Sequence, residues 1–83
     1  MEVFYNTKFL REYKKLPNKL KDAAEKQEKI FKDNPFDPRL KTHKLHGWLS
    51  EFFAFSIDSK YRIIFKINKN AAYFYSVGDH DIY

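Results

Sequence analysis

The sequence contains no cysteine, two glycines, three prolines and no long run of apolar residues. The absence of cysteine excludes a disulfide framework, a thiolate nucleophile and a cysteine-ligated zinc site. Because the longest apolar run is only a few residues, the sequence predicts no membrane-spanning segment. The first residues lack a basic stretch followed by an apolar one, so we expect no signal peptide and a cytoplasmic location.

Aromatic side chains and positive charge are what the chain has in quantity. Of its 83 residues, 19% are aromatic, which excludes intrinsic disorder and supplies large side chains for a small core. This length allows one domain, over residues 1–83. Sixteen lysines and arginines against eleven acidic residues give a net charge of +5, which is compatible with a polyanionic partner.

The first half of the chain has helical periodicity. Apolar residues recur at helical spacing from Phe9 to Leu16, and Thr7 is the expected N-cap. Pro17 lacks the N–H group that a continuing helix would use, so the first helix ends there and a second one follows. The pattern therefore predicts a helical hairpin over residues 7–33.

The second half changes to the periodicity of strands. The prolines of Asn34–Pro38 end the helical part, and side chains from Tyr61 to Ile67 alternate between two faces. Further expected strands are Glu2–Tyr5, Trp48–Ile57 and Ala71–Val77. These elements predict an α+β fold, in which a small antiparallel β-sheet carries the N-terminal two-helix hairpin on one face.

The other face of that sheet is expected to be open and basic. If the helices cover the side of Ile63 and Phe65, then Arg62 and Lys66 emerge on the opposite side. Residues 39–66 carry six lysines and arginines against two acidic residues. A basic face with interleaved aromatic rings is typical of proteins that bind single-stranded RNA.

Three histidines, His43, His46 and His80, supply groups that exchange protons near neutral pH. Cleavage of RNA by its own ribose 2′-hydroxyl needs a base, an acid and cations that stabilise the phosphorane-like charge. Because this chemistry needs no metal, we expect neither a metal site nor a cofactor.

Three segments together resemble a known family. They are Asn34-Pro-x-Asp-Pro-x-Leu-Lys-x-His-Lys-Leu-x-Gly47, Tyr61-Arg-Ile-Ile-Phe65 and Val77-Gly-Asp-His-Asp-Ile-Tyr83. Their order and spacing resemble the RelE/ParE superfamily of toxins from toxin–antitoxin systems, and most of all the RelE- and YafQ-type mRNA interferases. The resemblance implies a RelE-like fold and a metal-independent endoribonuclease that cuts mRNA on the ribosome. It also implies a cognate acidic antitoxin that neutralises the toxin.

The resemblance also implies roles for single residues. His43 and His80 match the acid–base histidines, Arg62 matches the arginine at the scissile phosphate, and Tyr83 falls where relatives place a tail aromatic residue. Lys41 and Lys44 match basic residues that grip RNA. With the other cations of the same basic region, they give the expected nucleic-acid-binding set of Arg39, Lys41, Lys44 and Lys66.

Departures from the family pattern leave two other functions open. Ser56 and Lys60 stand near positions where YafQ-type enzymes have a further histidine and an aspartate, and Ser76 or Val77 occupies the region of a second arginine of RelE-type enzymes. The chain could therefore be a ParE-like toxin that inhibits DNA gyrase without nuclease chemistry. It could also be a catalytically degenerate relative that only binds antitoxin or RNA.

Several residues also have structural interpretations. Arg62 could pair with Asp58 or Glu51, and His43 could bond the backbone where its loop enters the sheet. Trp48 and the segment Phe52–Phe55 are expected to lie in the core or to face the antitoxin rather than to stack on bases.

Overall fold

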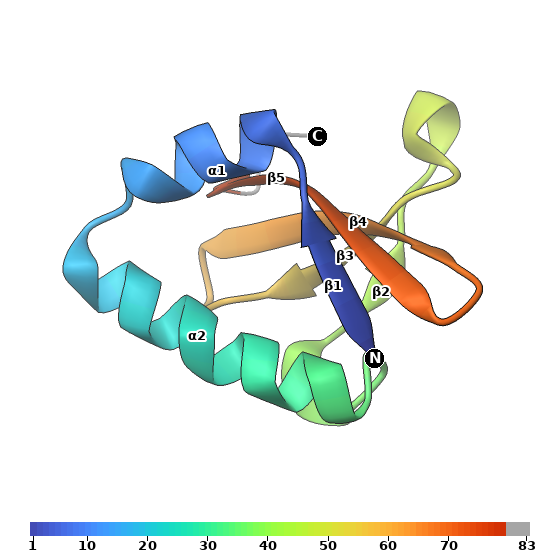
Figure 1. Cartoon of the computed structure of the whole chain (residues 1–83), viewed down its shortest axis with the longest axis horizontal. Helices are drawn as coiled ribbons and strands as arrows, with labels where there is room; N and C mark the ends of the chain where they lie inside the picture. The colour runs from blue at the N-terminus through green and yellow to red at the C-terminus, as the bar shows by residue number, and fades with distance from the viewer. Residues whose placement is uncertain (80–83) are drawn as a thin grey trace.

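The structure, a computed structural model, describes residues 1–79, and Figure 1 shows the path of the chain. The predictions for His80 and Tyr83 lie outside the described residues. The elements are β1 (Glu2–Tyr5), α1 (Thr7–Lys14), α2 (Asn18–Asp33), the 3-10 turn η1 (Pro38–Leu40), β2 (His43–Lys44), the 3-10 turn η2 (Gly47–Leu49), β3 (Phe53–Ser56), β4 (Tyr61–Asn68) and β5 (Ala71–Asp79). Across residues 1–79, no helix combines the length and the apolar character that crossing a membrane requires.

The two helices form the predicted hairpin, and the break falls at Pro17. The carbonyl of Pro17 accepts hydrogen bonds from the N–H groups of Leu20 and Lys21, each at 3.0 Å, and so begins α2. The predicted N-cap of α1 was wrong by one residue. Asn6, not Thr7, caps this helix, because its side-chain oxygen accepts from the N–H of Phe9 at 2.7 Å.

The sheet has five strands in the order β1-β5-β4-β3-β2. Neighbouring strands are antiparallel except for β1, which runs parallel to β5 and pairs Glu2 with Ala71 at one end and Tyr5 with Phe74 at the other. The prediction of a wholly antiparallel sheet was therefore wrong at this edge. A parallel neighbour needs a long crossover, and here the chain between the two strands includes both helices.

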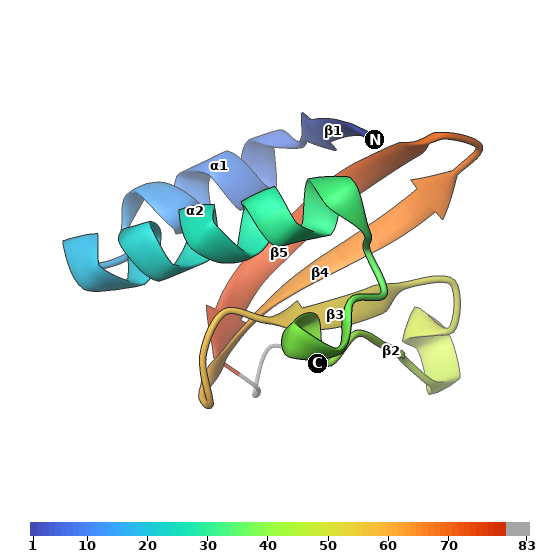
Figure 2. The same cartoon turned by 90° about the horizontal axis from the view of Figure 1, so that it is seen from below.

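Both helices cover the same face of the sheet, as Figure 2 shows from below. Phe31 of α2 is fully buried, and its ring lies 4.9 Å from that of Phe55 and 4.8 Å from that of Phe65. Ile63 and Phe65 of β4 belong to this core, so the predicted assignment of faces on β4 is confirmed. We call the opposite side the open face.

The open face is partly covered, which the sequence did not predict. Ile64 is only 2% exposed because Leu45 and Leu49 pack beside it in a second, smaller cluster. These two leucines come from the segment between β2 and β3, which folds back over the sheet. The predicted strand Trp48–Ile57 was accordingly too long: β3 begins at Phe53, and Trp48 lies in η2.

Candidate active site

Arg62 lies on the open face, near the beginning of the middle strand β4. It is the second residue of β4, where it pairs with Ser56 of β3 and Gly78 of β5. Directly paired residues point to the same side of a sheet, and Gly78 has no side chain to cover its neighbour. Arg62 as a whole is half-buried, and the strand alternation directs its side chain to the open face.

Some N–H donors of the Arg62 guanidinium have no hydrogen-bond acceptor at a good distance in the described part of the chain. Its Nη1 lies 3.4–3.5 Å from backbone oxygens of Asp58, Ser59 and Tyr61, which are long distances for hydrogen bonds. Its Nε is buried and, within the described part of the chain, has no hydrogen-bond partner. Buried donors of a cation are normally satisfied, so this pattern fits a group that receives an anion.

Neither carboxylate that the sequence offered as a partner for Arg62 binds it in the structure. Asp58 uses its Oδ1 to accept from the N–H groups of Lys60 and Tyr61, at 2.9 and 2.7 Å, and so closes the β3–β4 turn. Glu51 pairs with Lys66 at 3.0 Å. The salt-bridge interpretation of Arg62 is therefore wrong within residues 1–79.

His43 lies on the same face, on the short edge strand β2. It pairs with Ala54, which in turn pairs with Ile64, so its side chain is directed to the open face. Its Nδ1 lies 3.1 Å from the backbone oxygen of Lys41. A carbonyl oxygen can only accept, so Nδ1 is the donor in this contact. The backbone contact that the sequence left open is thus present.

The register gives the separation of these two groups. His43 and Arg62 are two strands apart and offset by two residues, which corresponds to roughly 12 Å between their Cα atoms. The other two predicted catalytic residues, His80 and Tyr83, are not described, so the structure leaves their predicted roles untested.

The four cations expected to bind nucleic acid fall into two groups. Arg39 binds the carboxylate of Asp37 with both Nε and Nη2, at 3.0 and 2.9 Å, and these hydrogen bonds lower the pKa of Asp37 to about 2. Lys66 pairs with Glu51. Lys41 and Lys44 are exposed, and neither forms an ion pair with another residue of the range 1–79. These two lysines therefore present the less compensated charge.

A polar cluster at the edge of β5 was not predicted. Ser76 stands in the region of the second arginine of RelE-type enzymes, and it accepts from Nζ of Lys8 at 2.9 Å and donates to Oε1 of Glu12 at 2.7 Å. The Nζ of Lys8 also lies 5.5 Å from the ring centre of Tyr75. In the sequence, Lys8 and Glu12 look like an ordinary helical surface pair, so no local signal could have placed them against β5.

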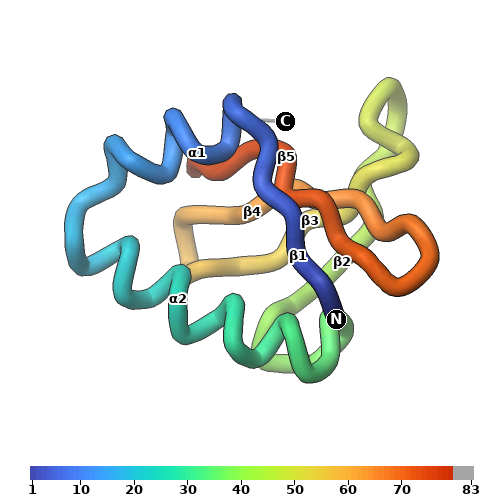
Figure 3. Tube along the Cα trace, viewed as in Figure 1, coloured from blue at the N-terminus to red at the C-terminus, as the bar shows by residue number. Residues whose placement is uncertain are grey.

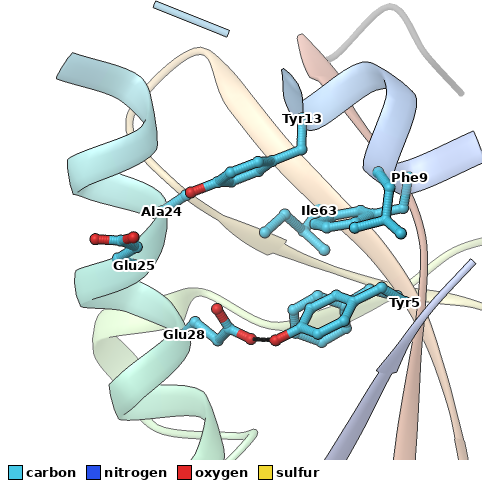
Figure 4. A pocket seen from close by; sticks show the side chains of 9 residues that line it. Tyr5, Phe9, Tyr13, Ala24, Glu25, Glu28 and Ile63 are labelled. Atoms are coloured by element: carbon cyan, nitrogen blue, oxygen red, sulfur yellow. Dashed lines mark hydrogen bonds between the residues drawn. The ribbon is translucent and has the colours of Figure 1, made fainter. Parts of the chain in front are cut away.

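A pocket of about 160 Å³ lies between the two helices (Figure 4). Because Ile63 lines it and Arg62 points to the opposite side of β4, the pocket and Arg62 lie on different faces of the sheet. Ile63 and Phe74 belong to its lining, and the hydroxyl of Tyr5 donates to the carboxylate of Glu28 beside it. Small-molecule sites usually have about 300–1,000 Å³, and this pocket is close to the ~150 Å³ that holds a benzene ring. It is separate from the candidate active site.

Comparison with known proteins identifies the fold. No protein-family model and no curated protein matches the chain by sequence. Among solved structures, YafQ from E. coli strain BL21(DE3) has a TM-score of 0.81 and 14% identity, covering 96% of this chain and 93% of that one. A YoeB/ParE toxin from Agrobacterium tumefaciens has a TM-score of 0.81 and 13% identity, with coverage of 96% and 99%.

A third similar structure is a complex. The YoeB–YefM complex from Staphylococcus aureus matches with a TM-score of 0.79 and 17% identity, covering 96% of this chain and 97% of the matched chain. These matches confirm the fold that the sequence motifs implied: the chain has the same α+β fold as these solved YafQ and YoeB structures.

Proposed function

We propose that this chain is the toxin of a type II toxin–antitoxin system and acts as a metal-independent endoribonuclease on mRNA. The observation that carries this proposal is Arg62, a guanidinium with an unbonded buried Nε on the open face of a toxin fold. A planar group with several donors is well suited to a phosphate, because it can donate two parallel hydrogen bonds. His43 shares that face and supplies a group for proton transfer.

The proposed reaction is a transesterification within the RNA. His43 removes the proton of a ribose 2′-hydroxyl through Nε2, and the 2′-oxygen forms a bond to the adjacent phosphorus. The bond from phosphorus to the 5′-oxygen breaks, and an acid protonates that leaving oxygen. Arg62 stabilises the additional negative charge of the phosphorane-like transition state. The products are a 2′,3′-cyclic phosphate and a 5′-hydroxyl end.

His80 is the proposed acid and Tyr83 is proposed to orient or stack on a nucleotide. In the sequence His80 stands between Asp79 and Asp81, and neighbouring carboxylates favour the protonated imidazolium that an acid requires. Lys41, Lys44, Lys66 and Arg39 are proposed to contact RNA phosphates on the mRNA or on the ribosome. Because exposed ion pairs are weak, Arg39 and Lys66 can exchange their carboxylate partners for phosphates.

Cleavage assays test this proposal. Purified protein is incubated with synthetic mRNA in chelator, and separately with ribosome-bound mRNA, and the new ends are analysed chemically. We expect the cleaved RNA to carry cyclic phosphate ends. Arg62→Ala should lower the cleavage rate about 100-fold or more, because it removes one preorganised group that stabilises the charge of the transition state. His43→Ala should also lower the cleavage rate markedly. Arg11→Ala is the matched control, since Arg11 is an exposed cation of α1. Undiminished cutting by Arg62→Ala would refute the mechanism.

A supercoiling assay with purified DNA gyrase distinguishes the proposed nuclease from the main alternative, a toxin that inhibits gyrase. One similar structure is described as a YoeB/ParE toxin, so inhibition of gyrase without RNA cleavage is the alternative that this fold also allows. Inhibition of gyrase together with intact mRNA would replace the proposed function by the ParE-like one.

The proposed partner is an acidic antitoxin. Similar solved structures include the DinJ–YafQ complex and the YoeB–YefM complex, and both are described as toxin–antitoxin complexes. A basic chain with a net charge of +5 suits an acidic partner that folds as it binds. We expect growth arrest when the toxin is induced alone and rescue when the neighbouring gene is expressed with it.

A further inference from the structure

Trp48 is unusually exposed for a tryptophan. It is the single tryptophan of the chain, and its exposed fraction of 86% is the largest among the exposed large hydrophobic side chains. Of the two positions expected for Trp48, in the core or facing the antitoxin, this exposure contradicts the first, and the second stays a prediction. An indole left in water contributes nothing to the stability of the fold, so its position is better explained by a contact with another molecule.

The turn that carries Trp48 is held firmly. Leu45 and Leu49, on either side of it, are 4% and 5% exposed and belong to the second cluster. Backbone hydrogen bonds join Leu45 to Phe52 and Phe52 to Leu49, at 3.0 and 2.9 Å. Gly47 has a φ of +68°, a left-handed conformation that glycine adopts at little cost. The exposed indole is therefore presented by a fixed support.

The charged residues between Asp37 and Glu51, the part of the sequence that contains Trp48, are all basic, although one of them, Arg39, is paired with Asp37. Between Asp37 and Glu51 the sequence has no acidic residue but contains three cations and two histidines, namely Arg39, Lys41, Lys44, His43 and His46. All five of these side chains are exposed. Protein interfaces are depleted of charge around their aromatic anchors, whereas single-stranded nucleic acid is bound by aromatic rings set among cations. An aromatic ring set among cations is thus an arrangement that suits single-stranded RNA.

The position of η2 fits a nucleotide beside the cleaved one. Figures 1 and 3 show this turn standing clear of both helices, at the opposite end of the sheet from the β3–β4 turn. Strand β3 connects the two places: it begins at Phe53, just after the η2 segment, and ends at Ser56, which pairs with Arg62. Three residue steps along a strand span about 10 Å. A base on Trp48 therefore belongs to a different nucleotide from the phosphate at Arg62.

We infer that Trp48 stacks on a nucleobase of single-stranded RNA and positions that strand for cleavage at Arg62. This inference rests on the proposed function, because it assumes that RNA lies on the open face. Trp48 is a positioning residue and not a catalytic one, since it lies away from the reacting atoms. Stacking is tolerant of sequence, so all four bases can occupy the site.

The test uses the fluorescence of the single indole. The probe is a single-stranded oligoribonucleotide with 2′-O-methyl groups at every position, which cannot be cut because it lacks the attacking hydroxyl. We expect saturable quenching of Trp48 by this RNA. With labelled RNA, anisotropy should show roughly tenfold weaker binding for Trp48→Leu and near-normal binding for Trp48→Phe. Leu10→Ala, at an exposed position on α1, is the control and should bind normally.

The outcomes separate this inference from the proposed function. Quenching with loss of affinity in Trp48→Leu and rescue by Trp48→Phe supports the inference. Cleavage of mRNA by the wild type without quenching, and with undiminished binding by Trp48→Leu, overturns the inference and leaves the nuclease in place. Quenching without any cleavage keeps the stacking site and overturns the nuclease. Loss of antitoxin binding in Trp48→Leu with RNA binding intact assigns the indole to a protein interface and also overturns the inference.

Discussion

On the helix face of the sheet, Phe55 and Phe65 are fully buried against Phe31, whereas on the open face Phe4 and Tyr73 stack on each other and remain 43% and 41% exposed. Aromatic rings therefore have different roles on the two faces of the sheet. Rings under the helices are removed from water and supply stability. Rings on the open face are left with accessible surface, and cations stand among them, so this face is available for binding.

The largest expected difference between the faces comes from truncating Phe31. Phe31→Ala removes a fully buried ring that contacts three others, so it should lower the free energy of unfolding by about 3–5 kcal/mol. Phe36→Ala is the control, since Phe36 is 53% exposed, and its cost should stay below about 1 kcal/mol. Urea denaturation measures both. Equal losses would contradict the assignment of the core to the helix face.

A smaller effect is expected from the cluster that covers part of the open face. Leu49→Ala should cost about 2 kcal/mol, at the low end for a buried leucine, because this cluster is small. The neighbouring Trp48→Ala should change stability by less than about 0.5 kcal/mol. Denaturation curves of the two variants compare them directly. A stable Leu49→Ala protein would mean that the η2 support is not tied to the fold.

The polar edge of β5 should make stability depend on acid pH. Burial alone would raise the pKa of Glu12, but the hydrogen bonds from Lys8, Ser76 and the N–H of Val77 outweigh it and lower the pKa below its usual 4.5. A lowered pKa stabilises the folded protein above the usual value, and this stabilisation is lost as the pH falls through the pKa of the folded state.

Replacing this carboxylate isolates the effect. Glu12→Gln should cost about 1 kcal/mol at pH 7, since the group is partly exposed and screened by solvent. The variant should also lose less stability than the wild type as the pH is lowered below the usual pKa of 4.5. Urea midpoints across this range measure the difference, and parallel curves for the two proteins would show that Glu12 does not hold the edge of β5.

The smallest effect is expected at the link between β1 and α2. Burial and the carboxylate of Glu28 both raise the pKa of Tyr5 above its usual 10.0. A raised pKa stabilises the fold below the usual value, and the stabilisation is lost as the pH rises through the pKa of the folded state. Tyr5→Phe should cost less than about 1 kcal/mol at pH 7 and should flatten the alkaline loss of stability. An absorbance titration of the phenol checks the direction of the shift.

The sequence predicts the elements whose signals are local. The alternation from Tyr61 to Ile67 was enough to identify β4 and to assign Ile63 and Arg62 to opposite faces, and Pro17 was enough to divide the two helices. Side-chain periodicity and backbone chemistry act within a few residues, so these predictions needed no knowledge of distant parts of the chain.

Features that depend on distant residues were missed. Ile64 alternates to the open side as predicted, but nothing in β4 indicates that Leu45 and Leu49 return to cover it. Likewise, the pairing of Lys66 with Glu51 depends on how the η2 segment folds, and the exposure of Trp48 depends on which neighbours turn inward. Composition gave the basic character of the candidate site, but the distribution of ion pairs that modifies it is a property of the tertiary structure.

The parallel pairing of β1 with β5 has a consequence for biosynthesis. It joins Glu2 to Ala71, so this contact spans both helices and the other strands of the sheet. Contacts of this kind raise the contact order and form late in folding. A nascent chain therefore carries β1 without its neighbour until β5 has left the exit tunnel, and the sheet cannot close before then.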